Sequence, residues 1–226
     1  MLEIDCAGEL LHLLPEKAVF WPREKTLIIA DVHLGKPAAF RQSGLAVPEN
    51  TTTDDLARLD KILNQTASER LVILGDFFHA SAGLQPEMLD VVEAWRKDRF
   101  ETEIILLLGN HDKRAGNPPQ SWNIEIAKTK SVAPFLFQHA PGEDSAGYVL
   151  SGHIHPAISL SEKFGGGIRA PCFCFGERCA MLPAFGSFTG MHNIQSRKRD
   201  RIFAIGDGNV IDVTARFSRL RKASSR

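Results

Sequence analysis

Side chains that can ligate a metal ion gather in a few short segments of this sequence. Six of the eight histidines lie in or beside these segments, together with carboxylate and amide side chains. The candidate ligands are Asp31, His33, Asp76, Asn110, His139, His153 and His155. Mixed carboxylate, imidazole and amide donors suit manganese, iron or zinc better than calcium. The residue types therefore predict a site for divalent ions of this kind.

The spacing of the candidate ligands favours two metal ions over one. In an extended segment His153 and His155 point in opposite directions, which suits two neighbouring ions. Two ions about 3.5–4 Å apart can activate a water molecule and clamp the attacking and leaving oxygens of an in-line displacement. A carboxylate must bridge them, and Asp76 is the natural candidate. Taken alone, Asp31-x-His33 would be a strand-end turn and Asp76 a turn cap; taken together, the segments predict a two-metal hydrolytic site.

Each polar segment follows a short apolar run. The runs are residues 26–30, 71–74, 104–108, 135–137 and 148–150. Runs of this length, rich in Ile, Val and Leu and closed by polar residues or glycine, are typical of buried strands. In open α/β sheets the ligand site gathers beyond the carboxyl ends of the strands. We therefore expect the polar segments to meet at one site.

Amphipathic helical patterns separate the early strands, at residues 51–63 and 86–98. Alternating strands and helices predict parallel pairing with helical crossovers. The second half differs, because residues 168–175, 178–183, 201–205 and 210–214 read as strands joined by glycine-containing turns. The expected fold class is α/β, with two stacked mixed β-sheets flanked by helices in an α/β/β/α sandwich. We expect one domain over residues 1–215 and a basic C-terminal tail over residues 216–226.

The charge of the chain is balanced overall but not along its length. The 226 residues carry 27 basic and 27 acidic side chains, so composition alone identifies no highly charged partner. From Met191 to Arg226 there are nine Lys and Arg residues against three Asp residues, a net charge of +6. Such a basic segment can follow a phosphate backbone. A solvated, partly frayed end explains it equally well.

The cysteines and the N-terminus bear on the cellular location. Cys172, Cys174 and Cys179 lack the paired spacing of zinc sites. Because they alternate with phenylalanines, we expect reduced thiols buried in a strand. The first residues lack the basic start and unbroken apolar run of a secretory signal, and no stretch reaches membrane-spanning length. We therefore expect a cytoplasmic protein.

The order of the polar segments resembles that of the calcineurin-type metallophosphoesterase superfamily. The matching segments are Asp31-x-His33, Gly75-Asp76-x-x-His79, Gly109-Asn110-His111-Asp112, His139 and Gly152-His153-x-His155. The resemblance implies that one metal takes Asp31, His33, Asp76 and His155, and that the other takes Asp76, Asn110, His139 and His153. It also implies that His111 is the catalytic histidine, which donates to a phosphoryl oxygen or to the leaving group.

His79 departs from the pattern of many family members, which carry an Asp there that can orient the catalytic histidine. The segment from Gly75 to His79 instead resembles that of SbcD-like repair nucleases. The His79 side chain cannot act as a carboxylate, which leaves the proton arrangement around His111 open. His79 either contacts the substrate and shares the acid role, or lies behind the ligands bonded to a backbone carbonyl.

Flanking segments resemble a bacterial subgroup, the DNA ligase-associated phosphoesterases (the PdeM group). These segments are Leu13-Leu-Pro15, Phe20-Trp-Pro22, Ala30 to Lys36, Phe40-Arg41 and Leu182 to Gly190. The resemblance implies a DNA endonuclease or phosphodiesterase in bacterial DNA repair, with single-stranded or damaged DNA as substrate and a ligase and helicase as associates. We expect two divalent ions, with manganese preferred over iron or zinc. The alternatives are a small-molecule phosphodiesterase or phosphatase, acting on cyclic nucleotides or phosphomonoesters, and a non-catalytic repair scaffold.

Three basic residues near the ligand segments are candidate substrate contacts. Lys36 and Arg41 follow the first ligand pair, and Arg114 follows the catalytic segment. The planar guanidinium of arginine suits phosphate through its fork of donors. The alternative is that Lys36 is solvated and Arg41 pairs with a carboxylate. Residues 186–190 could line the cleft, but a structural turn also accounts for their glycines.

Overall fold

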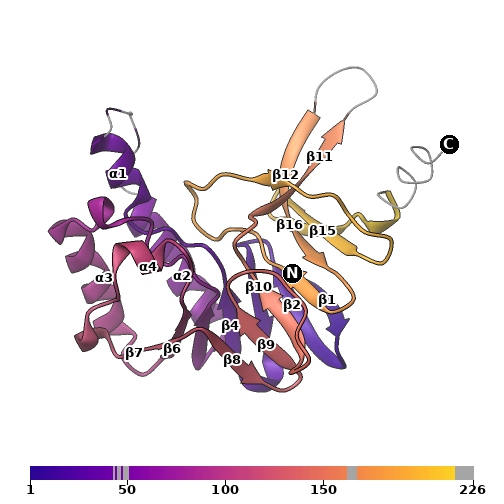
Figure 1. Cartoon of the computed structure of the whole chain (residues 1–226), viewed down its shortest axis with the longest axis horizontal. Coiled ribbons are helices and arrows are strands. Elements are labelled where there is room, and N and C mark those ends of the chain that lie inside the picture. The colour runs from indigo at the N-terminus through magenta and orange to yellow at the C-terminus, as the bar shows by residue number, and fades with distance from the viewer. Residues whose placement is uncertain (43, 45–46, 48–50, 162–166, 217–226) are drawn as a thin grey trace.

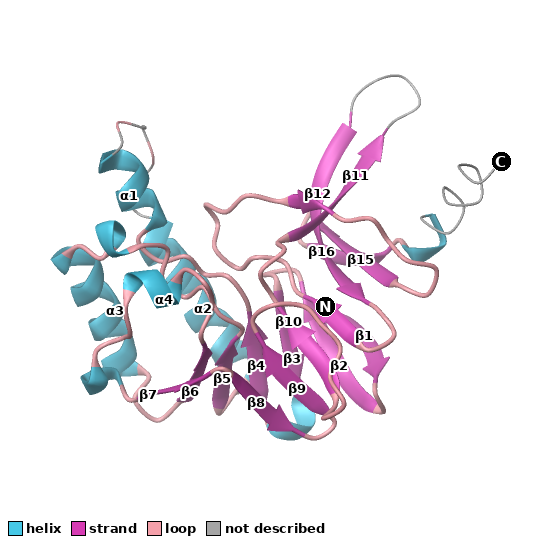
Figure 2. Ribbon diagram, in the orientation of Figure 1, coloured by secondary structure: helices cyan, strands magenta, loops and turns pink. Residues whose placement is uncertain are grey.

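The computed structural model describes residues 1–42, 44, 47, 51–161 and 167–216. Two β-sheets face each other, and α-helices gather on the outer side of the first sheet (Figure 1; Figure 2). The predicted fold class, two mixed sheets with flanking helices, is confirmed. Residues 217–226, most of the predicted C-terminal tail, lie outside the described residues. The division into a domain over residues 1–215 and a tail stays a prediction.

The first sheet contains seven strands that follow one another in chain order. They are β1 (Leu2–Cys6), β2 (Glu9–Leu14), β3 (Ala18–Trp21), β4 (Thr26–Ile29), β5 (Arg70–Ile73), β6 (Glu103–Leu107) and β7 (Ile124–Ala127). Strands β1 to β4 pair antiparallel, whereas β4 to β7 pair parallel. Parallel neighbours need crossovers, and helices supply them between β4 and β5 and between β5 and β6. The predicted strand–helix alternation is thus confirmed, whereas the sequence reading did not assign β1 to β3.

Among the described residues, the helices α1 to α4 precede or follow the parallel strands. They are α1 (Lys36–Gln42), α2 (Thr51–Thr66), α3 (Pro86–Asp98) and α4 (Asp112–Ala115), and short 3-10 turns lie at Pro22–Glu24, Ser81–Gly83 and Gln120–Trp122. Helix α3 has the predicted bounds, and Pro86 stands at its first turn, where its missing N–H costs nothing. Helix α2 runs three residues past the predicted end. None of the described helices is long and apolar enough to cross a membrane.

The second sheet is formed by the C-terminal half of the chain. Its strands are β8 (Thr129–Val132), β9 (Phe135–Gln138), β10 (Tyr148–Ser151), β11 (Pro156–Ser161), β12 (Gly167–Phe175), β13 (Cys179–Met181), β14 (His192–Asn193), β15 (Arg201–Gly206) and β16 (Asn209–Asp212). The four predicted strands of this half correspond to β12, β13, β15 and β16. Strands β9, β10 and β13 run parallel, so their carboxyl ends lie at one edge.

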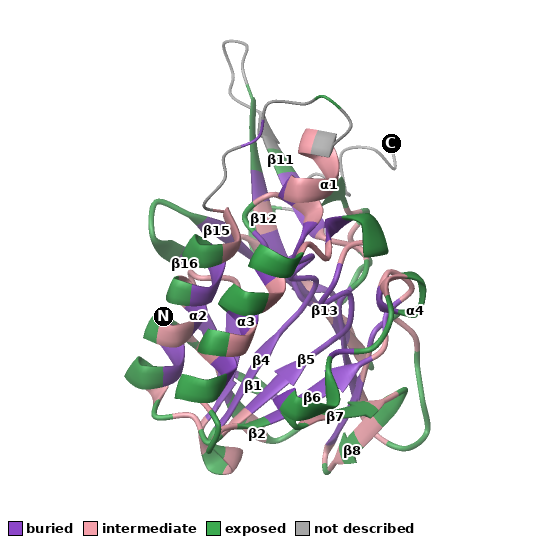
Figure 3. Cartoon of the chain, turned by 90° about the vertical axis from the view of Figure 1, so that its left-hand side faces the viewer, coloured by how far each residue is buried: buried purple, intermediate pink, exposed green. Residues whose placement is uncertain are grey.

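Alternating side chains of the central strands build two cores. Ile28, Val72 and Ile105 pack between the sheets, while neighbouring residues such as Leu27 and Leu71 pack against the helices. This follows from the period of two in a strand, where successive side chains face opposite sides. Figure 3 shows the central strands β4 to β6 as buried beneath the helices. Such two-sided burial holds the ends of these strands in fixed positions.

The cysteines and part of the basic C-terminal segment have structural roles. Cys172 and Cys174 are buried in β12 as free thiols, and burial raises the pKa of Cys172 to about 12. This confirms the prediction for Cys172 and Cys174, whereas Cys179, in β13, is only partly buried. Arg201 donates to the backbone oxygen of Asp5, and Arg199 pairs with Glu177. The bond of Arg201 ties the C-terminal half of the chain to β1, whereas the exposed pair of Arg199 contributes little to stability.

Candidate metal centre

The loops that follow β4 and β5 run side by side past the end of the sheet. The N–H of Asp31 donates to the carbonyl of Gly75 at 3.1 Å, and that of His33 donates to the carbonyl of Asp76 at 2.9 Å. A parallel bridge between Leu34 and Phe78 continues this pairing. The first predicted ligand pair is thereby placed directly beside Asp76.

Two histidines that follow strands of the second sheet, His139 and His153, lie beside these loops. His139 follows β9, and its carbonyl accepts the N–H of Gly152 at 3.0 Å, just before His153. The N–H of His153 donates to Asp31 Oδ2 at 2.9 Å. Gly152 allows this close approach because it has no Cβ. A Cβ there would lie only 2.6 Å from the same oxygen. The carboxyl ends of strands from both sheets therefore meet at one site.

Three overlapping groups of donor atoms result, each with its atoms within 4.8 Å of one another. The first is Asp31, His33 and His155; the second is Asp76, His139 and His153; the third is His33, His79 and His111. The first two groups divide the predicted ligands as the family resemblance implies for two metals. Asn110 joins the second group, because its Oδ1 lies 3.1 Å from His139 Nε2.

Asp76 stands between the first two groups. Its Oδ2 lies 3.9 Å from His33 Nε2 and 3.5 Å from His139 Nε2. The other carboxylate oxygen accepts the backbone N–H of His111 at 2.8 Å. Gly109 leaves room for this oxygen, since a Cβ there would collide with it. Asp76 is thus held in the position that a bridging carboxylate requires.

In His139 and in His155, one ring nitrogen donates a hydrogen bond to a backbone carbonyl. The other ring nitrogen therefore carries a lone pair that can bind a metal ion. His139 Nδ1 donates to the carbonyl of Leu74 at 2.8 Å, so its Nε2 carries a lone pair. That lone pair faces two acceptor oxygens, Asn110 Oδ1 at 3.1 Å and the Asp76 carboxylate oxygen Oδ2 at 3.5 Å. His155 Nδ1 likewise donates to the carbonyl of Gly190 at 3.1 Å, which leaves its Nε2 as an acceptor. Converging lone pairs repel one another unless a cation lies between them.

Asp31 supports the same conclusion. Its Oδ1 is buried and has no hydrogen-bond partner among the described residues, although it lies 3.6 Å from His155 Nε2. A buried carboxylate oxygen without a partner costs free energy, which a cation would offset. The donor set and this orphaned oxygen both fit divalent metal ions.

The backbone at these residues is unusual. Five of the candidate ligands have a positive φ: Asp31 (53°), His33 (53°), Asp76 (50°), His153 (72°) and His155 (52°). A non-glycine residue in this region costs on the order of 1–3 kcal/mol, and such residues cluster at functional sites. The strain turns each side chain sharply off the end of its strand toward the others.

Burial among other imidazoles keeps His33 neutral. Desolvation, followed by the neighbouring His155 and Lys36, lowers the pKa of His33 to about 2. Burial and the nearby His111 lower the pKa of His79 to about 4. Neutral imidazole is the form that ligates metals, and the lowered pKa favours that form of His33.

The backbone of His79, rather than its side chain, orients His111. His111 Nδ1 donates to the carbonyl of His79 at 2.6 Å. The two rings stack with centroids 4.8 Å apart. A carbonyl therefore does what an Asp does in many family members, which answers the question that the sequence left open. His79 Nδ1 itself lies 3.4 Å from His33 Nδ1.

The three predicted substrate contacts are placed differently. Lys36 begins α1 beside the site, and burial lowers its pKa. Arg41 lies in the last turn of the same helix, and its guanidinium donates to the carbonyl of Val47 at 3.4 Å. Arg114 is exposed on α4. The structure thus brings Lys36 to the donor groups, and phosphate contacts by all three stay predictions.

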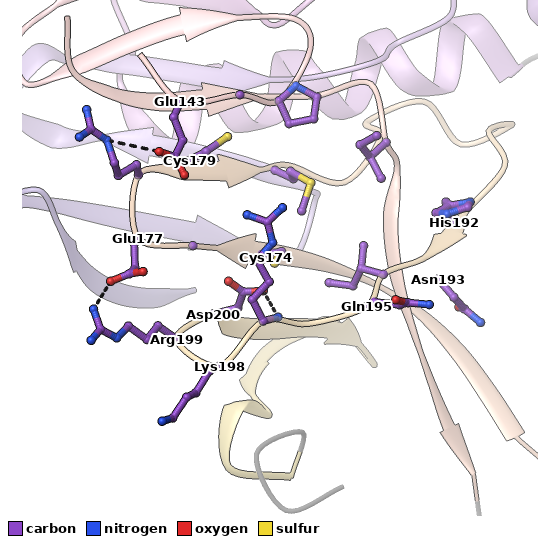
Figure 4. A pocket seen from close by; sticks show the side chains of 18 residues that line it. Glu143, Cys174, Glu177, Cys179, His192, Asn193, Gln195, Lys198, Arg199 and Asp200 are labelled. Atoms are coloured by element: carbon purple, nitrogen blue, oxygen red, sulfur yellow. Dashed lines mark hydrogen bonds and ion pairs between the residues drawn. The ribbon is translucent and has the colours of Figure 1, made fainter. Parts of the chain in front are cut away.

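The sequence reading missed a cavity of about 750 Å³ in the second half of the chain, whose lining includes none of the candidate ligands. Ile154, between His153 and His155, lies at one end, and Gly142 enters from the loop after β9. Figure 4 shows this cavity, with the labelled side chains of Glu143, Glu177 and Arg199 around it. Its lining comes from four separate segments, so no local sequence pattern could have indicated it.

Fold and donor groups together define a class of enzyme. The sequence pattern of the Calcineurin-like phosphoesterase family matches residues 24–141, about half of the chain. This protein belongs to the calcineurin-like phosphoesterase family and is a phosphoester hydrolase. The family resemblance stated from the sequence is confirmed.

One solved structure is similar over nearly the whole chain. It is the nuclease MPE of Pseudomonas putida, 38% identical, with 94% of this chain and 99% of that chain covered and a TM-score of 0.83. The phosphoesterase Yfce of E. coli is 14% identical, covers 84% of this chain and 98% of its own, and has a TM-score of 0.40. A comparison with curated protein sequences finds no match.

Proposed function

We propose that this chain is a phosphodiesterase that uses two divalent metal ions to cleave nucleic acid. The observation that carries the proposal is the convergence of unprotonated donor atoms at the joined strand ends of both sheets. One ion would be held by Asp31, His33, Asp76 and His155, and the other by Asp76, Asn110, His139 and His153. We prefer manganese, with iron or zinc as alternatives.

The chain itself supplies charge, position and a proton path. Divalent ions bound here would polarise the phosphoryl oxygens and lower the pKa of a water molecule. His111 would donate a proton to the leaving oxygen. Because its Nδ1–H is held by the carbonyl of His79, Nε2 is the atom that takes up and returns a proton. The stack with His79 keeps the ring in this orientation.

A cavity lined by basic residues of the second half of the chain supports a large substrate. A cavity of about 750 Å³ exceeds what a single phosphate group fills. Arg197, Lys198 and Arg199 line it, and the ion pair of Arg199 with Glu177 is exposed and therefore weak. Such cations can exchange their partners for phosphate. The cavity therefore favours a strand of nucleic acid over a cyclic nucleotide or a phosphomonoester.

The finer assignments rest on sequence resemblance and on the relative in Pseudomonas putida, which is described as a nuclease. We propose single-stranded DNA as the preferred substrate and DNA repair as the process. Association with a DNA ligase and a helicase stays a prediction of that resemblance, and a cytoplasmic location stays a prediction of the N-terminal sequence.

A panel assay with manganese tests the proposal. Single-stranded DNA, duplex DNA, cyclic nucleotides, phosphomonoesters and bis-p-nitrophenyl phosphate would be compared at equal enzyme concentration. We expect the highest kcat/KM on single-stranded DNA. Faster turnover of cyclic nucleotides or monoesters would identify a small-molecule enzyme, and bound metal without any hydrolysis would identify a scaffold.

A further inference from the structure

Two half-exposed phenylalanines stand beside the third donor group, and the proposed mechanism does not use them. Phe40 lies on α1 and Phe188 lies in the segment between β13 and β14. Their rings contact edge to face, with centroids 5.5 Å apart. Figure 1 shows the connection between β13 and β14 reaching toward α1. The pair is thus assembled from distant parts of the chain.

A continuous series of ring contacts links this pair to the candidate metal ligands. Phe40 lies 6.2 Å from the ring of His79, and His79 lies 5.4 Å from that of His33. Helix α1 also begins directly from the ligand segment, because the N–H of Lys36 donates to the carbonyl of His33 at 3.1 Å. Phe40 is one helical turn further on, so it shares a face with Lys36. The Lys36 ammonium lies 5.9 Å from the Phe40 ring centroid.

Phe188 is presented by a braced segment. The N–H of Ser187, its neighbour, donates to the buried carboxylate of Asp55 at 3.0 Å. Arg58 pairs with the same carboxylate at 2.9 Å and donates to the carbonyl of Phe185. On the other side, the N–H of Phe185 donates to the carbonyl of Ala30, next to the ligand Asp31. Phe188 is therefore held in place before any substrate arrives.

We propose that Phe40 and Phe188 form a subsite for the nucleobase of the nucleotide next to the scissile phosphodiester. An unpaired base stacks on aromatic side chains regardless of its identity, and Lys36 beside Phe40 matches the phosphate of the same nucleotide. Bases in a duplex are already stacked, so the subsite selects single strands. The inference rests on the proposed nuclease function and names the feature that distinguishes a nucleotide from a simple diester.

The experiment uses hexathymidylate with one abasic deoxyribose in the middle, cleaved by the manganese enzyme. Chromatography of the products compares bonds beside the abasic residue with bonds between two thymidines in the same molecule. We expect the wild type to cut a bond beside the abasic residue roughly 5- to 150-fold more slowly, as base stacking implies. Stopped-flow fluorescence of a 2-aminopurine oligonucleotide reports stacking before cleavage, and should be quenched on binding.

The variants are Phe40→Leu and Phe188→Leu, which keep apolar volume but remove the aromatic face. The double variant should cut all bonds of the hexamer at equal rates and should not quench the fluorescence. Phe188→Tyr should keep both the discrimination against the abasic residue and the quenching. Phe100→Leu, at an exposed phenylalanine elsewhere (58% exposed), is the matched control. Thermal unfolding checks that each variant is folded.

Three results would overturn the subsite, and they are distinguishable. If the wild type cuts all bonds of the hexamer evenly, the nuclease function stands and the subsite does not. If the leucine variants retain the discrimination, other residues recognise the base. If the wild type hydrolyses bis-p-nitrophenyl phosphate but no oligonucleotide, the proposed function itself fails.

Discussion

Asp76 is the residue on which both proposed metals depend. It is buried, its Oδ2 faces His33 and His139, and its Oδ1 is fixed by the N–H of His111. A neutral amide of the same shape can keep that last bond but cannot bridge two cations with negative charge. The side chain therefore offers a clean test of dinuclear binding.

Asp76→Asn should reduce bound manganese from two ions per chain and abolish DNA cleavage. Metal content after dialysis, measured by mass spectrometry, and turnover provide the readouts. Asp90→Asn, which changes a carboxylate of α3 away from the donor groups, is the control. Two tightly bound ions in Asp76→Asn would refute the bridging role.

His111→Gln should keep both metals and lower turnover by about 10²–10⁴-fold on DNA, the usual contribution of acid–base catalysis. The loss should be smaller on bis-p-nitrophenyl phosphate, because its leaving group needs no proton. His12→Gln, on β2, controls for loss of a histidine remote from the site. An equal loss on both substrates would argue for a binding role, and normal turnover would exclude a catalytic one.

At the scale of elements, the site depends on how the loops after β5 and β6 are tied together. The buried carboxylate of Asp112, at the start of α4, accepts the N–H of Phe78 at 2.9 Å and the N–H of Gly109 at 3.0 Å. One side chain thus joins the two loops that carry Asp76 and Asn110. Its role is positional, since it lies outside the three donor groups.

Asp112→Ala leaves two buried N–H groups without acceptors and should destabilise the fold by about 2–6 kcal/mol. Urea unfolding measures the loss, and Lys113→Ala, at the exposed neighbouring position, is the control. Manganese affinity should fall together with stability, because the loops that carry Asp76 and Asn110 would no longer be tied to each other. A change below about 0.5 kcal/mol, the range of surface substitutions, would mean that these loops are fixed by other contacts.

At the scale of the whole molecule, the cavity is a second feature beside the donor groups, lined by residues outside the three groups. The cavity draws on the loop after β9, the β12–β13 turn and the segment between β14 and β15 (Figure 4). Arg197 and Lys198 lie on that last segment, on the opposite side of the molecule from α3 (Figure 1). Part of the positive charge of the basic segment from Met191 to Arg226 thus lines this cavity.

Arg197→Glu with Lys198→Glu should weaken binding of single-stranded DNA and reduce the slope of log affinity against log salt by about 1 to 2, since two cations no longer meet phosphates. Turnover of bis-p-nitrophenyl phosphate should be unchanged. Lys61→Glu with Lys97→Glu, exposed on α2 and α3, reverses the same charge elsewhere. Equal salt slopes in the two double variants would place the DNA path outside the cavity.

The sequence alone predicted the central strands, the main helices and the candidate donor residues. Apolar runs and helical periodicity are local properties, and they predicted β4, β5, β6, α2 and α3 close to their observed positions. Asp31, Asp76 and His153 were identified because rare, chemically capable side chains follow strand ends, where α/β folds place their sites. Their role as metal ligands stays a prediction that the geometry supports.

Only the tertiary structure decided which atoms face one another. The carbonyls of His79 and Gly190 orient His111 and His155, and any residue supplies a carbonyl, so no sequence pattern marks them. Phe40 and Phe188 meet across most of the chain length, and the cavity is likewise built from separate segments. Residue type and local periodicity set the donor atoms and the strands. Their convergence depends on long-range packing, which a local pattern does not contain.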